Sequence, residues 1–508
     1  MNQLKTGAVL NYIVLLLNSL VNLLYTPYML RMMGQSEYGL YSLVASVIGY
    51  LTILDLGFGN AIVRYTAKYR AEGKTEEQYR MFGMFLILYL IIGVIAFCLG
   101  LGLYFNIDNL FGDTMTSVEL EHARVMMLIL VFNLAFTFPM SIFGAIMSAY
   151  ERFVFPKLIN ILRILLNTGI MILLLSQGYK AIAMVTLTTI FNVLTLIINY
   201  IYCKKVLHIK LRFGHFQWGF LLEVSKYSLW IFLNAIMDKI YWSTGQFVLG
   251  AVAGTIAVSV YAVAIHLQSM YLQFSTSISS VFLPKVTSMV TLKASNKDLS
   301  DLFIRTGRIQ NIVMIFITCG FIVFGQQFVN LWAGEAYSEA YIMALVFFIS
   351  LYTPLIQNLG ITILQARNQL KFRSILYVCL AIVALMAEII CAKIWGGIGC
   401  AMAIAGALGI GQGIVMNVYY YKVQHLDVVR FWKEIIKMDI VPVLVTLAAI
   451  VIVNKVCIIS SWLQLCVGIG LFSIIFLSLV ILFSLNDYEK SLLIKPIIRR
   501  FKNDKAER

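Results

Sequence analysis

The stretch GQSEYGLYSLVASVIGYLTILDLGFGNAIVRYTAKY, residues 34–69, decides the fold of this chain. It opens with a glycine turn and continues through about 25 mainly apolar residues, enough for a helix to cross about 30 Å of hydrocarbon. The apolar run then gives way to Arg64, Lys68, Arg70 and Lys74. Such a change from apolar to basic residues is typical of the cytoplasmic end of a membrane span. The stretch therefore predicts a transmembrane helix.

The composition of the whole chain agrees with this prediction. Of its 508 residues, 61% are hydrophobic and only 12% are charged, and the mean hydropathy is +0.87. Soluble domains are about 45–50% apolar, so a soluble globular protein is excluded. The net charge of +15 is spread over short loops instead of a basic domain, so we expect no nucleic-acid partner. The eight cysteines contain no CxxC pair, so we expect no metal site.

Apolar runs long enough to cross a membrane follow one another along the whole chain. We expect fourteen spans, at about residues 8–30, 38–62, 81–105, 122–148, 158–176, 180–202, 227–250, 256–284, 311–332, 340–365, 373–394, 398–420, 437–456 and 462–485. Most of the 39 Lys and Arg residues lie in the termini and in the connections after even-numbered spans. The positive-inside rule therefore places both termini in the cytoplasm.

The sequence contains a weak internal repeat. Three matches occur in order at offsets of 217 to 220 residues, namely Gly34 and Tyr41 with Gly254 and Tyr261, Ala149 and Phe155 with Ala366 and Phe372, and Ala183-Met184 with Ala401-Met402. Each offset contains six spans, an even number, so the two copies keep the same orientation. The repeat predicts an all-α fold of two six-helix lobes, related by a pseudo-two-fold axis along the membrane normal, with two extra C-terminal helices.

The repeat also sets the expected domain boundaries. They are an N-terminal lobe at 1–205, a cytoplasmic interfacial linker at 206–226, a C-terminal lobe at 227–422, an interfacial helix with the last two spans at 423–485, and a basic cytoplasmic tail at 486–508. Two lobes of this kind place a cavity between them and move by rocking, which is the architecture of an alternating-access transporter.

Charged side chains inside the spans are the candidates for function, because burying a charge in a bilayer is costly. Asp238 and Lys239 lie near the middle of the seventh span. They either pair with other buried side chains or face a cavity, where Lys239 would attract an anionic headgroup. Arg163 in the fifth span either extends to the interface or presents its planar fork to a pyrophosphate. Arg64 is placed at the mouth of the same basic vestibule.

Two carboxylates are candidates for carrying a coupling ion. Asp55 lies in the second span and Glu388 in the eleventh. A carboxyl group in a low-dielectric environment exchanges protons readily, although a satisfied structural pair is the alternative for each.

Motifs of enzymes are absent from the sequence. It contains no Walker motif, HExxH or GxSxG, and the outer connections are too short for a catalytic domain. We therefore expect no catalytic residues, no cofactor and no ATP hydrolysis, and a transport step driven by an ion gradient or by downhill metabolism.

The segment LRMMGQSEYGLYSLVASVIGYLTILDLGFGNAIVRYTAKY, residues 30–69, resembles the N-terminal signature of the bacterial polysaccharide transporter, or oligosaccharide flippase, family. This family belongs to the multidrug/oligosaccharidyl-lipid/polysaccharide exporter superfamily. The resemblance extends to the fourteen-span length, to Leu249-Gly250, Gly254 and Tyr261, and to the FxxxxLLxxSK linker at 216–226. In one respect the chain departs from the family: Gly245 stands where relatives carry an Asp, and Asp238 lies two helical turns earlier.

The resemblance implies a MATE-like flippase in the bacterial cell membrane. Its cargo would be an undecaprenyl-pyrophosphate-linked oligosaccharide, moved from the inner to the outer leaflet for surface polysaccharide synthesis. It also implies a basic central cavity. We expect H⁺ or Na⁺ as the coupling ion, because of the two carboxylates, and polymerase or export machinery as a partner. We expect the protein to act as a monomer, because each chain contains both lobes. Two alternatives remain within the superfamily, a multidrug or toxin extruder and a flippase for the peptidoglycan precursor.

Overall fold

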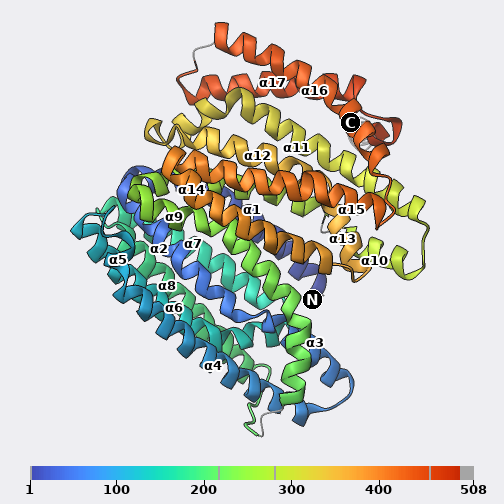
Figure 1. Ribbon diagram of the computed structural model, residues 1–508. Helices are drawn as coiled ribbons and strands as arrows, with labels where there is room; N and C mark the ends of the chain where they lie inside the picture. The colour runs from blue at the N-terminus through green and yellow to red at the C-terminus, as the bar shows by residue number, and fades with distance from the viewer. Residues whose placement is uncertain (1–2, 215–217, 280–281, 457–458, 492–508) are drawn as a thin grey trace, which may run out of the picture. The chain divides into compact units, whose positions relative to one another are not determined.

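The fold is helical throughout the residues that the computed structural model describes, which are 3–214, 218–279, 282–456 and 459–491. No strand occurs in these ranges. Within them, eleven helices are long and apolar enough to cross a membrane, or twelve when a bent pair counts as one span. That pair is α12 (Ala340–Ile356) and α13 (Asn358–Ala366). The prediction of an all-α membrane protein is confirmed (Figure 1).

Two of the long helices each contain two predicted spans. α9 (Trp218–Ser279) is interrupted by non-helical backbone at Gly254, and α14 (Lys371–Leu408) by non-helical backbone at Gly396. Both interruptions fall where neighbouring predicted spans meet. Each of the fourteen predicted spans therefore corresponds to helical structure in the described residues.

The helices group into two compact units. The first holds the described residues up to Ala262 together with Tyr377–Cys400, and the second holds Val263–Leu376 and the described residues from Ala401 onward. These contact units divide the chain differently from the predicted lobes, because the seventh and eleventh spans pack with the first unit. The contact units do not test the six-helix lobes, which were inferred from the internal repeat and stay a prediction.

The first unit is built on long apolar helices. They are α1 (Gln3–Met33), α2 (Gln35–Leu51), α3 (Phe58–Ala71), α4 (Thr75–Phe105), α5 (Ile107–Phe111), α6 (Ser117–Ala149), α7 (Val154–Ser176), α8 (Ala181–Lys205), most of α9, and part of α14. α4, α6 and α8 lie side by side (Figure 1). A 3₁₀ turn, Thr52–Asp55, separates α2 from α3, because Leu56 and Gly57 both have positive φ.

The second unit includes the last two spans. Its remaining helices are α10 (Leu283–Thr291), α11 (Asn296–Trp332), α15 (Met416–Lys422), α16 (Val428–Val456) and α17 (Trp462–Phe483), with a π-helical segment at Gly409–Val415. A buried apolar cluster that includes Cys319, Met438 and Phe472 joins α11, α16 and α17. Burial of apolar surface therefore attaches the two terminal spans to this unit.

The interfacial segments predicted from the sequence have a different form. The interfacial helix predicted at the start of 423–485 is not separate from the thirteenth span, because α16 runs continuously from Val428 to Val456. α9 begins at Trp218, inside the linker predicted at 206–226. Residues 215–217 of that linker and 492–508 of the predicted tail lie outside the described residues.

The backbone supports the internal repeat. Residues with positive φ recur in corresponding pairs, namely Gly34 and Gly254, Gly73 and Lys293, Glu151 and Asn368, Gly178 and Gly396, and His208 and His425. A stacked aromatic pair recurs as well, with ring centroids 4.1 Å apart for Phe155 and Tyr202 and 4.3 Å apart for Phe372 and Tyr419. The same turns and the same packing thus recur at the predicted offset.

Candidate functional site

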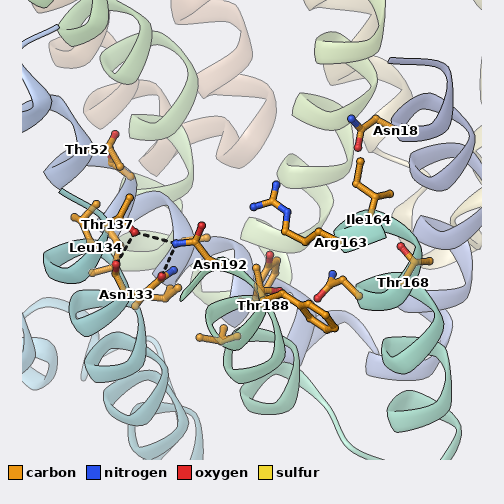
Figure 2. Close-up of a pocket in the computed structure, with 18 of the residues that line it drawn as sticks. Asn18, Thr52, Asn133, Leu134, Thr137, Arg163, Ile164, Thr168, Thr188 and Asn192 are labelled. Carbon is orange, nitrogen blue, oxygen red and sulfur yellow. Dashed lines mark hydrogen bonds between the residues drawn. The ribbon is translucent and has the colours of Figure 1, made fainter. Parts of the chain in front are cut away.

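A cavity of about 520 Å³, with both polar and apolar residues in its lining, lies in the first unit. Its walls come from α1, α2, α6, α7 and α8 and from the 3₁₀ turn at Thr52 (Figure 2). Most of its polar lining is made of amides and hydroxyls, namely Asn18, Tyr41, Thr52, Asn133, Thr137, Asn167, Thr168, Thr188 and Asn192. Arg163 is its one charged lining residue in the described part of the chain. The cavity is therefore cationic and rich in neutral hydrogen-bonding groups.

The guanidinium of Arg163 extends from α7 into this cavity (Figure 2). One of its terminal nitrogens donates a hydrogen bond to Asn160 Oδ1 at 3.0 Å, one turn earlier on the same helix. None of the ion pairs among the described residues includes Arg163. Most of its five N–H donors are thus available to an anionic ligand.

A hydrogen-bonded amide cluster forms another part of the wall. Asn192 on α8 donates to Asn133 Oδ1 at 2.8 Å and to Thr137 Oγ1 at 2.9 Å, and both partners lie on α6 (Figure 2). The buried Oδ1 of Asn167 has no hydrogen-bond partner among the described residues. The cluster holds α6 and α8 together and orients the polar lining.

Lys239 on α9 approaches α2 near this cavity but is not among the described lining residues. Its Nζ lies 3.5 Å from the position that a Cβ on Gly49 would occupy, and Gly49 lines the cavity. Lys239 therefore lies near one residue of the wall, whereas Arg163 enters the cavity itself. Their joint role in binding stays a prediction.

The other predicted binding residues lie elsewhere. Arg64 is exposed on α3 and does not line the cavity. Asp238 is exposed on α9 and is also outside the lining. Their roles in binding stay predictions.

The two carboxylates have contrasting environments. Asp55 lies in the 3₁₀ turn and accepts a hydrogen bond from the Tyr89 hydroxyl at 2.9 Å. Glu388 on α14 has an exposed fraction of 0%, and neither of its carboxyl oxygens has a hydrogen-bond partner among the described residues. Their part in ion coupling stays a prediction. Of the two, Asp55 has a hydrogen-bond partner in Tyr89, whereas Glu388 has none among the described residues.

Sequence reasoning did not single out the amide cluster, because amides are frequent in many of the spans and also serve helix packing. A second polar group was also missed, in the second unit. Asp439 on α16 accepts hydrogen bonds from Asn311 at 2.6 Å and from Tyr352 at 2.8 Å. The sequence does contain an indication of this group, because Asp439 is an acidic residue within the mainly apolar segment KMDIVPV, residues 437–443.

Comparison with known proteins gives one family. Residues 4–290, more than half of the chain, match the family described as polysaccharide biosynthesis protein. The chain is 20% identical over 332 residues to the uncharacterized membrane protein EpsK of Bacillus subtilis (strain 168). That match covers 65% of this chain and 65% of the relative, just under two thirds of the relative's length.

Solved structures share the fold. A lipid II flippase, MurJ, in an inward closed conformation has a TM-score of 0.70 at 17% identity, over 97% of this chain and 99% of that one. An inward-facing multidrug resistance MATE family transporter of the MOP superfamily has a TM-score of 0.62 at 14% identity, over 80% and 98%. The predicted MATE-like fold is confirmed by these similarities.

Proposed function

Because the chain belongs to the polysaccharide biosynthesis protein family, we propose that it is a flippase for lipid-linked oligosaccharides. The cargo is an undecaprenyl-pyrophosphate-linked repeat unit, which moves from the inner to the outer leaflet by alternating access. The single observation that carries this proposal is the cavity that Arg163 enters without an acidic partner in the described residues.

The chemistry of the cavity suits this cargo. A guanidinium forms paired hydrogen bonds with phosphate oxygens, and a lysine ammonium adds a compact positive charge. Amides and hydroxyls donate to and accept from sugar hydroxyls. The volume of about 520 Å³ falls within the usual range of ligand pockets, about 300–1,000 Å³. We assign Arg163 and Lys239 to the pyrophosphate, and Asn133, Asn192 and their neighbours to sugar.

The same lining argues against an extruder of cationic drugs. Such a cargo needs carboxylates, and the cavity has none among its described lining residues. A peptidoglycan-precursor flippase has a closely related cargo, so the mass of the accumulated lipid must separate it from the proposed function.

The remaining parts of the proposal concern the setting. Both termini face the cytoplasm of a bacterial cell. An H⁺ or Na⁺ gradient drives the transport cycle through Asp55 or Glu388. The protein acts as a monomer beside the polymerase or export machinery. The distribution of Lys and Arg supports the orientation.

The test is a deletion strain complemented with variants. Lipid-linked intermediates are identified by mass spectrometry, and a non-permeant glycan-modifying enzyme reports their side. With Arg163→Ala, a complete oligosaccharide-lipid should accumulate on the cytoplasmic side while surface polymer falls. Arg163→Lys should restore part of the export.

Arg124→Ala is the matched control, because Arg124 pairs with exposed Asp108 outside the cavity. It should export normally. Unchanged lipid intermediates with raised drug sensitivity in the deletion strain would overturn the proposal in favour of an extruder. Accumulation of the peptidoglycan precursor would reassign the cargo.

A further inference from the structure

Glu388 is an acidic residue of the first unit that is completely buried. Its exposed fraction is 0%, and both carboxyl oxygens lack a hydrogen-bond partner among the described residues. None of the described ion pairs includes it. An ionised carboxylate without partners is strongly disfavoured in such a place, so the pocket accommodates the neutral, protonated form.

The ionisable groups within electrostatic range of Glu388 are weak acids. They are Tyr50 on α2, Tyr241 and Tyr261 on α9, and Cys400 on α14. The Tyr241 hydroxyl is buried and has no hydrogen-bond partner among the described residues. Tyr50 is hydrogen-bonded to Thr244 on α9. The Tyr241 hydroxyl and the Glu388 carboxyl are thus two buried polar groups in this region that lack hydrogen-bond partners among the described residues.

A sodium ion fits this pocket poorly. Transporters coordinate Na⁺ with the freed carbonyls of unwound backbone, whereas α14 is helical around Glu388. The described residues contain no group of three or more His, Cys, Asp or Glu side chains that could hold a metal ion. A proton needs only the carboxyl itself.

The surroundings of Glu388 and the cavity include neighbouring residues of α2. Tyr50 follows Gly49, which lines the cavity and lies beside Lys239. Thr244, the partner of Tyr50, lies on α9 between Lys239 and Tyr261. A change in the Tyr50–Thr244 hydrogen bond therefore acts on the contact between α2 and α9 that also positions Lys239.

Resting on the function proposed above, we propose that Glu388 is the proton-binding site that drives transport, and that Tyr50 and Thr244 connect it to the cargo cavity. When the carboxyl loses its proton to water, Tyr50 and Tyr241 donate to the carboxylate. Tyr50 then gives up Thr244, and α2 shifts against α9 beside Lys239. Rebinding of a proton restores the arrangement seen here. Asp55 keeps a structural role at the break between α2 and α3.

The first test is spectroscopic and independent of transport. The full chain in lipid nanodiscs should show the infrared carbonyl-stretch band of a protonated carboxyl group, which disappears as the pH is raised. Glu388→Gln should lose this band, whereas Asp439→Asn should keep it. Tyr50→Phe should raise the pH at which the band disappears. A band that Glu388→Gln leaves unchanged would overturn the proposal.

The second test measures export in cells and in proteoliposomes. Glu388→Gln resembles the protonated state, so it should fold normally and should abolish the dependence of flipping on an imposed pH gradient. If Arg163→Ala stops export while Glu388→Gln keeps the full response to the pH gradient, the proton site is wrong and the flippase function stands. If neither variant changes lipid intermediates or surface polymer, the proposed function fails as well.

Discussion

Gly34 and Gly254 adopt nearly the same backbone conformation, with φ 77° and ψ 170° at Gly34 and φ 78° and ψ −176° at Gly254. This region of φ and ψ is accessible almost only to glycine. Each glycine directly precedes a helical segment, and a tyrosine follows it seven residues later, Tyr41 and Tyr261 respectively. The two residues thus mark the same turn in the two copies of the repeat.

Replacing either turn glycine with alanine should destabilise the protein. A side chain forced into this backbone region costs about 1–3 kcal/mol. Gly34→Ala and Gly254→Ala should therefore each lower the apparent unfolding temperature of the purified protein. Gly144→Ala is the control, because Gly144 lies inside α6 with open space around it and alanine favours a helix. Equal unfolding temperatures for all three variants would contradict the shared turn.

Lys239→Ala should abolish export while the protein still inserts in the membrane. The ammonium lies beside Gly49, and in the proposed function it helps to bind the pyrophosphate, so its loss should weaken that binding. Lys239→Arg should keep a measurable part of the activity because the charge remains. Surface glycan reports export, and exposed Lys293, which lies outside the cavity, is the control position. Undiminished surface glycan in Lys239→Ala would remove this residue from the site.

Asn192→Leu should reduce flipping about tenfold. The change removes two hydrogen bonds and leaves Asn133 and Thr137 without their partner. A net contribution of about 0.5–1.5 kcal/mol for each bond gives a loss of that order. The rate of appearance of lipid-linked glycan on the outer side measures it. Asn109→Leu, at an exposed position of α5, should leave the rate unchanged.

Arg308→Ala should be among the most destabilising changes in the second unit. Arg308 is 6% exposed and binds Glu489, which is 1% exposed, through contacts of 2.5 and 2.9 Å. Removing one partner of a buried pair costs about 3–5 kcal/mol, because the other charge is left uncompensated. Arg430→Ala breaks an exposed pair with Asp301 and should cost about 0–1 kcal/mol. Thermal unfolding of the two variants should therefore differ clearly.

The orientation in the membrane is testable with reporter fusions. A reporter active only in the cytoplasm should function after Lys210, in the connection between α8 and α9. A reporter active only outside should function after Asp113, between α5 and α6. The reverse pattern would mean that the positive-inside argument assigns the termini to the wrong side.

Much of the fold was predictable because hydrophobic length is a local property. The spans and the repeat follow from short sequence patterns, and the breaks at Gly254 and Gly396 fall between spans that these patterns predict. The candidate site was predictable only in part. Arg163 was expected to face inward or to reach the interface, and its place in the cavity depends on how α7 packs against α1 and α8. Arg64, expected beside it, is exposed on α3.

The sequence by itself determined that this chain is a helical membrane protein with a duplicated plan, because the bilayer requires long apolar helices and glycine is required at particular turns. Only the tertiary structure decided which polar groups meet. Asn133 and Asn192 bond across two helices, Lys239 approaches Gly49, and Glu388 is left without a partner among the described residues. These relationships depend on helix rotation and packing between distant segments, which no local pattern encodes.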